Sequence, residues 1–88
     1  NMEQERRFFA ALEKLRDKEW YLPLARAAET FKESTTTWNV ITWYHRLDAK
    51  IELLWEIKLM DLSVYMRLNG TLEDYFKAFL RRMEKEEL

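Results

Sequence analysis

The stretch that decides the fold is residues 37–68, TWNVITWYHRLDAKIELLWEIKLMDLSVYMRL. It contains neither Gly nor Pro, the two residues that most often interrupt a helix. Apolar residues recur in its first half at alternating spacings of four and three, the heptad pattern of a helix with one buried seam. These residues are Val40, Tyr44, Leu47, Ile51 and Leu54. We therefore predict one long helix over residues 37–68 as the central element of the domain.

The second half of this stretch, residues 51–68, is apolar around most of a helix. When it is projected at 100° per residue, only a narrow polar stripe remains. The stripe consists of Glu52, Glu56, Ser63 and Arg67. One partner helix cannot cover so wide an apolar arc, so we expect the other helices or a second subunit to bury it. The charged residues within the run exclude a membrane span, which needs about 20 largely uncharged residues.

Three further helices are expected around the central one. Charged and apolar residues alternate with helical spacing over residues 3–19 and 72–86, while Pro23 suits the first turn of a helix over residues 23–32. The hydroxyl run 34–37 predicts a cap at the start of the central helix. Asn69-Gly70 predicts its end, because glycine readily adopts the left-handed conformation found after helices. The sequence therefore predicts a single all-α domain over residues 1–88, folded as a compact four-helix bundle.

Composition narrows the classes of function. Four Trp, four Tyr, five Phe and four Met can supply a core in a chain of only 88 residues. The chain has no Cys, which excludes disulfides and cysteine-based zinc sites, and only one Gly, which excludes a glycine-rich phosphate loop. The 15 Lys and Arg residues nearly balance the 16 Asp and Glu residues, so no global field attracts nucleic acid or a membrane. Because a polar start at residues 2–7 is also unlike a signal peptide, we expect a cytoplasmic protein.

No residue pattern predicts catalysis. His45 could act as a general base oriented by Asp48 or Glu52, but no motif places a nucleophile beside it. Glu52 and Glu56 share one helix face without the Glu-x-x-His motif of di-iron bundles. We therefore expect a solvated polar stripe here, and predict no catalytic residue, no cofactor and no metal site.

Two sets of residues are candidates for interaction. The first is an aromatic group with one nearby cation, Trp38, Trp43, Tyr44 and Arg46, whose members point to different sides of one helix. Trp and Tyr are enriched at interface hot spots, although packing against Trp20 is an equally good explanation for them. The second is Lys58 with Asp61, a charged pair within the apolar arc that could set the register between helices or subunits. Lys58 could instead lay its stem across the core and extend its amine to water.

Residues 24–47 also faintly resemble a helix-turn-helix unit, with small alanines at 25, 27 and 28 where two helices would cross. The resemblance implies that the second helix faces the major groove of DNA with Thr36, Thr37, Asn39, Thr42 and Arg46. The turn is too long and lacks glycine, and basic and acidic residues nearly cancel there. We therefore expect a non-catalytic module that binds protein, itself included, as a homo-oligomer and most simply a dimer. A small helix-turn-helix regulator of DNA is the alternative.

Overall fold

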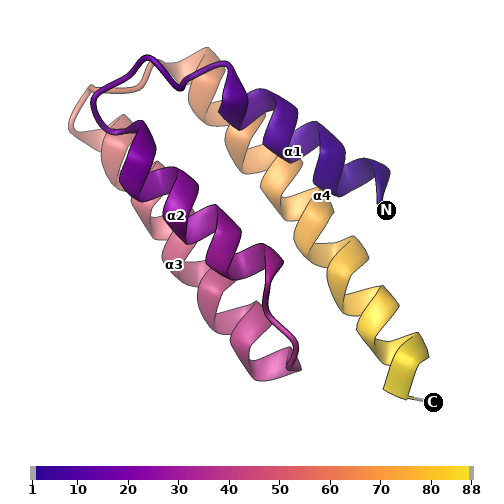
Figure 1. Cartoon of the computed structure of the whole chain (residues 1–88). Helices are drawn as coiled ribbons and strands as arrows, with labels where there is room; N and C mark the ends of the chain where they lie inside the picture. The colour runs from indigo at the N-terminus through magenta and orange to yellow at the C-terminus, as the bar shows by residue number, and fades with distance from the viewer. Residues whose placement is uncertain (1, 88) are drawn as a thin grey trace.

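The computed structural model describes residues 2–87, apart from the side chain of residue 87, and shows four helices without a strand in that range. The helices are α1 (Glu3–Glu13), α2 (Tyr21–Lys32), α3 (Thr37–Glu56) and α4 (Leu62–Glu87). Successive helices run in opposite directions, with α1 against α4, α4 against α3 and α3 against α2 (Figure 1). The predicted all-α four-helix bundle is thus confirmed, and its dimensions are 43 × 21 × 18 Å.

An aromatic cluster around Tyr75 forms the centre of the core. The Tyr75 side chain is fully buried on α4. Its ring centroid lies 6.0 Å from that of Phe8 in α1 and 4.9 Å from that of Phe31 in α2. Its hydroxyl donates a hydrogen bond of 3.1 Å to the carboxylate of Glu5 in α1. Burial, followed by the negative charge of Glu5, raises the pKa of Tyr75, so its phenol stays protonated as the donor of this bond.

The predicted central helix is wrong in its length, because α3 ends at Glu56 instead of continuing to residue 68. Lys58 adopts a left-handed backbone conformation, with a φ of 67°. The N–H of Lys58 donates to the carbonyl of Trp55 at 3.0 Å, and that of Leu59 donates to the carbonyl of Leu54 at 2.9 Å. This pair of bonds is the Schellman motif that closes many helices, with lysine in the position where glycine is usual.

Tertiary packing explains why the helix ends without a local breaker. Met60, two residues after the left-handed position, is buried in the core. Asp61 then caps α4: its Oδ1 accepts hydrogen bonds from the Val64 N–H at 3.0 Å and the Ser63 hydroxyl at 2.9 Å. These bonds, that from the Val64 N–H first, lower the pKa of Asp61. The turn therefore interrupts the helical hydrogen bonds between α3 and α4, and this loss is offset by the burial of Met60 and by the cap that Asp61 provides.

The predicted break at Asn69-Gly70 is also wrong, since α4 passes through both residues. Gly70 does not have a positive φ. Thr71, which was expected to cap a new helix, instead donates its hydroxyl to the carbonyl of Arg67 at 2.7 Å, as a threonine inside a helix does. The single helix α4 thus contains the end of the helix predicted over 37–68 and all of the helix predicted over 72–86. Burial of Leu68, Leu72 and Tyr75 on one face favours this continuous helix.

The first half of the chain follows the prediction more closely. α1 ends at Glu13, earlier than the predicted residue 19, and turns occupy residues 14–20. α2 begins at Tyr21, so Pro23 lies in its first turn, where a missing N–H breaks no helical bond. The predicted hydroxyl cap is confirmed, because the Thr36 side chain accepts a hydrogen bond of 3.1 Å from the Asn39 N–H.

Replacing Gly70 with alanine is expected to stabilise the protein. A Cβ added at Gly70 would meet no atom within 4 Å, so it creates no clash. Alanine loses less backbone freedom than glycine on entering a helix, and we expect Gly70→Ala to raise the free energy of unfolding by about 0.5–1 kcal/mol. Urea unfolding followed by circular dichroism measures this change. A loss of stability would instead indicate the left-handed glycine that the sequence suggested.

Replacing Lys58 with glycine is also expected to stabilise the protein. Because a side chain disfavours the left-handed conformation, Lys58→Gly should raise the free energy of unfolding by up to about 1 kcal/mol. Lys58→Ala is the matched control, since it removes the same charge but keeps the Cβ atom. If both variants were stabilised equally, the strain would not lie in the backbone.

Candidate interaction surface

The four aromatic and basic residues that the sequence singled out do not form one patch. Trp38 is 75% exposed on the first turn of α3 and points away from the bundle. Trp43 is half-buried towards α2, and the guanidinium of Arg46 lies 4.9 Å from the centre of its ring. Tyr44 is half-buried towards α4, where it stacks on Phe76 with ring centroids 3.9 Å apart. The structure thus brings Trp43 and Arg46 together and separates them from Trp38 and Tyr44.

Lys58 and Asp61 lie in the turn between α3 and α4 instead of within a continuous apolar helix. Both side chains are exposed, and no ion pair joins them in the part of the chain that the structure describes. Asp61 is engaged as the cap of α4, and Lys58 holds the left-handed position. Their role in the register between subunits stays a prediction.

The polar stripe of α3 is acidic where it faces α4. His45 is exposed, and its ring centroid lies 5.3 Å from that of Tyr44. Asp48, one helical turn after His45, is half-buried. Burial, and then repulsion from Glu52, raises the pKa of Asp48, while His45 lowers it. No group of three or more metal-ligating side chains occurs within residues 2–87.

The packing of α2 and α3 differs from that of a helix-turn-helix. The two helices run antiparallel along each other (Figure 1). The helices of a helix-turn-helix cross at about 90–120°, which frees the second one to enter the major groove. Here α3 also packs against α4, through the stack of Tyr44 on Phe76. This geometry does not favour the DNA-binding alternative over residues 24–47.

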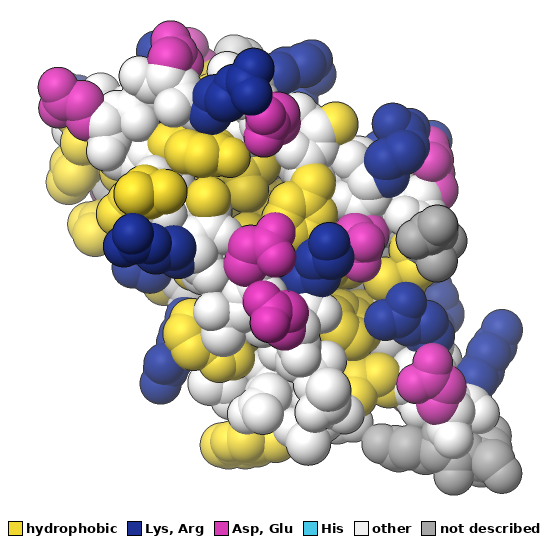
Figure 2. All heavy atoms as spheres, in the orientation of Figure 1, with side chains coloured by type: hydrophobic (Ala, Val, Ile, Leu, Met, Phe, Trp, Pro, Cys, Tyr) yellow, Lys and Arg dark blue, Asp and Glu magenta, His cyan; other side chains and the backbone are white. Residues whose placement is uncertain are grey.

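Exposed large hydrophobic residues concentrate at the corner where α3 turns into α4, within the apolar run that we expected the other helices or a second subunit to bury. Among the residues that the structure describes, six of the eight exposed large hydrophobic ones fall between residues 53 and 66. These six, which we call the α3–α4 corner, are Leu53, Trp55, Ile57, Leu59, Leu62 and Met66. Figure 2 shows hydrophobic side chains gathered at the upper left, over the end of the bundle that holds the α1–α2 and α3–α4 connections.

The corner combines a rigid aromatic pair with two aliphatic pairs. The rings of Trp55 in α3 and Tyr65 in α4 stack with centroids 4.5 Å apart and planes 14° apart. Leu53 and Ile57 are one turn apart on α3, as are Leu62 and Met66 on α4, so each pair extends along its helix. The sequence signal for this surface was the excess of apolar residues over 51–68. Because the turn divides that run between two helices, part of it stays uncovered.

No protein family model, no curated protein and no solved structure matches this chain. No helix between residues 2 and 87 combines the length and the apolar character needed to cross a lipid bilayer.

Neutralising Asp48 is expected to stabilise the protein at neutral pH. Its pKa is raised in the folded state, so the charged form costs stability above that pKa, and the cost disappears as the pH falls below the unfolded value. For this partly exposed group we expect Asp48→Asn to raise the free energy of unfolding by about 0.2–0.5 kcal/mol at pH 7 and low salt. Urea unfolding at about pH 7 and at about pH 3 measures the stability difference between variant and wild type with the Asp48 carboxyl charged and with it protonated.

Asp74→Asn provides the control for this experiment, because Asp74 is an exposed carboxylate on α4. It should not reproduce the gain at neutral pH. A gain for Asp48→Asn that persisted unchanged at pH 3 would contradict an electrostatic origin.

Proposed function

We propose that this protein is a non-catalytic interaction module that associates with a second copy of itself through the α3–α4 corner. The observation that carries the proposal is the concentration of exposed large hydrophobic residues within 53–66. Exposed apolar patches of this kind mark interaction sites in proteins. The cysteine-free composition supports the cytoplasm as the proposed location, since small secreted domains are usually rich in disulfides.

The size of the corner supports a second copy as the partner. Six large side chains, mostly about half exposed, leave on the order of 600 Å² in contact with water, close to the roughly 600–800 Å² that each partner contributes to a small specific interface. Two-fold symmetry places the same patch on both sides of a dimer, so an apolar patch meets an apolar patch. The partner then needs no chemistry beyond that of this chain.

The arrangement of the corner also suits a dimer. Trp55 is held in place by its stack on Tyr65, so little side-chain freedom is lost when a partner covers it. Large aromatic residues that are already ordered are typical hot spots. Leu53, in a hollow with Trp20 and Leu24 on the α2 side of α3, and Met66, exposed on α4, add aliphatic contact area. The corner thus has an ordered centre and an apolar margin.

Introducing charge at the corner is expected to abolish self-association. Leu53→Glu and Met66→Glu each place a carboxylate on an exposed helical position, where it can be solvated in the monomer but not in a dimer interface. We expect the wild-type protein to sediment as a dimer at tens of micromolar and the double variant to sediment as a monomer, with unchanged helical content by circular dichroism.

Trp38→Glu is the matched control, since Trp38 is the most exposed large hydrophobic residue outside the corner. It lies near the opposite end of α3, roughly 25–30 Å along the helix from Ile57. The control variant should remain a dimer. A monomeric wild type would refute self-association, whereas loss of the dimer in Trp38→Glu alone would move the interface to the start of α3.

A further inference from the structure

A groove runs along the α1–α4 contact; it shares no lining residue with the α3–α4 corner, although Ser63 and Val64 in its wall directly follow Leu62 of the corner. It consists of two adjoining hollows of about 260 and 300 Å³, which share Ala11, Lys14 and Arg67. The other residues of its walls are small, apolar or hydroxyl-bearing, apart from the cations Arg6 and Arg7. Ala10 and Ala11 keep the α1 wall low, so the backbone of a partner can approach closely.

The charges that line the groove are all positive. Arg7 lies on α1, Lys14 directly follows its last residue and Arg67 lies on α4, and the lining contains no Asp or Glu. Within residues 2–87, neither Lys14 nor Arg67 takes part in an ion pair. Arg7 and Lys14 are two helical turns apart, roughly 10 Å along the axis, with Arg67 across the groove. With Arg6, four cations therefore surround a strip whose lining is otherwise apolar or hydroxyl-bearing.

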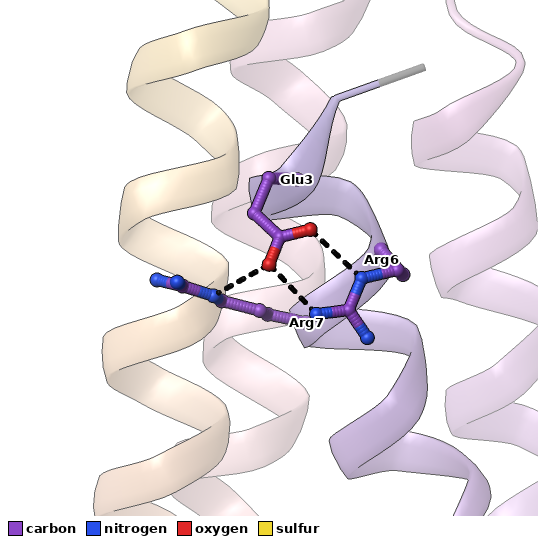
Figure 3. Close-up of polar contacts among 3 residues, drawn as sticks. All are labelled: Glu3, Arg6 and Arg7. Atoms are coloured by element: carbon purple, nitrogen blue, oxygen red, sulfur yellow. Dashed lines mark hydrogen bonds and ion pairs between the residues drawn. The ribbon is translucent and has the colours of Figure 1, made fainter.

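Glu3 orders the end of this strip without neutralising it. Its carboxylate accepts two hydrogen bonds from Arg6, at 2.7 and 2.8 Å, and one from Arg7, at 3.2 Å. Figure 3 shows the Arg6 and Arg7 side chains diverging from Glu3, with Arg7 extending towards α4. The hydrogen bond from Arg6, with both positive charges, lowers the pKa of Glu3 to about 2, so this carboxylate stays charged at neutral pH. One carboxylate shared by two arginines leaves a net positive end.

We propose that the α1–α4 groove binds an acidic amphipathic helix of a partner protein. Ala10 and Val64, which reach the surface of the groove above the buried Ala11, Leu15 and Leu68, would contact the apolar residues of that helix. Arg7, Lys14 and Arg67 would pair with Asp or Glu residues that flank its apolar stripe. This surface is independent of the α3–α4 corner, so a dimer could carry two such grooves.

The chemistry of the groove favours a peptide over nucleic acid. Proteins that hold nucleic acid without reading its sequence use many phosphate contacts, and on single strands they add aromatic side chains on which bases stack. The groove lining has few cations and no Trp, Tyr or Phe. A phosphate backbone presents no apolar surface, so it would make no contact with the apolar residues of the groove.

A fluorescent synthetic peptide tests this proposal. The probe is a helix of roughly 18 residues, five turns, with Leu along one face and Glu beside it. We expect it to bind the wild-type protein in fluorescence anisotropy and to bind more weakly as salt rises from about 50 to 300 mM, because the added ions screen the pairs. The double variant Lys14→Glu with Arg67→Glu should bind roughly tenfold more weakly. Arg67→Gln, which removes one charge without reversing it, should show a smaller loss.

The matched control is the double variant Lys50→Glu with Lys85→Glu, which changes the net charge equally at exposed positions outside the groove. When both proteins are measured at 300 mM salt, this control should bind the peptide with the affinity of the wild type. The proposal is refuted if the acidic peptide does not bind at low salt, or if the control variant loses as much affinity as the groove variant. Tighter binding of a short DNA duplex than of the peptide would also refute it. So would loss of self-association in the groove variant, because a second copy would then cover the groove.

Discussion

The bundle depends on the aromatic contacts of Tyr75, which connect α4 to both α1 and α2. Phe31 brings α2 to α4 by packing edge-on against Tyr75 and Phe79, although α2 runs along α3. Phe8 attaches α1 to the same ring, and the hydroxyl of Tyr75 reaches Glu5. A small domain buries only a modest fraction of its surface, so a few large aromatic residues must supply much of its core.

The large aromatic residues of the core lie in one half of the bundle, so the other end has fewer of them to cover its apolar residues. Phe31, Tyr75 and Phe79 belong to the half that contains the end of α2 and the middle of α4. At the α3–α4 corner Met60 is buried, but the large apolar residues on either side of it remain exposed. The four helices that the structure describes within residues 2–87 leave these side chains exposed. The surface that we propose for self-association is therefore the part of the apolar sequence that this four-helix arrangement leaves uncovered.

α4 separates two surfaces of different chemistry. On its α3 side lie the stacks Trp55–Tyr65 and Tyr44–Phe76, near the carboxylates that raise the pKa of Asp48. On its α1 side lies Arg67, facing the cations of α1. The formal net charge of −1 conceals this local difference, because carboxylates gather around Asp48 whereas the charged residues that line the α1–α4 groove are all cations. A protein with no global field can thus still present local fields to two partners.

The sequence by itself determined the all-α class, the four helices, the cap at Thr36 and the apolar seam of Val40, Leu47 and Ile51. These features follow from local periodicity and hydroxyl chemistry, which do not require knowledge of the neighbours. The tertiary structure alone decided that α3 ends at Glu56, just before the left-handed Lys58, and that α4 continues through Gly70. Burial of Met60 outweighs the cost of a left-handed lysine, and the apolar face of α4 outweighs the weak helix propensity of one glycine. The candidate surfaces were equally beyond the sequence, since the corner depends on that turn and the groove joins residues 7, 14 and 67, which only the α1–α4 contact brings together.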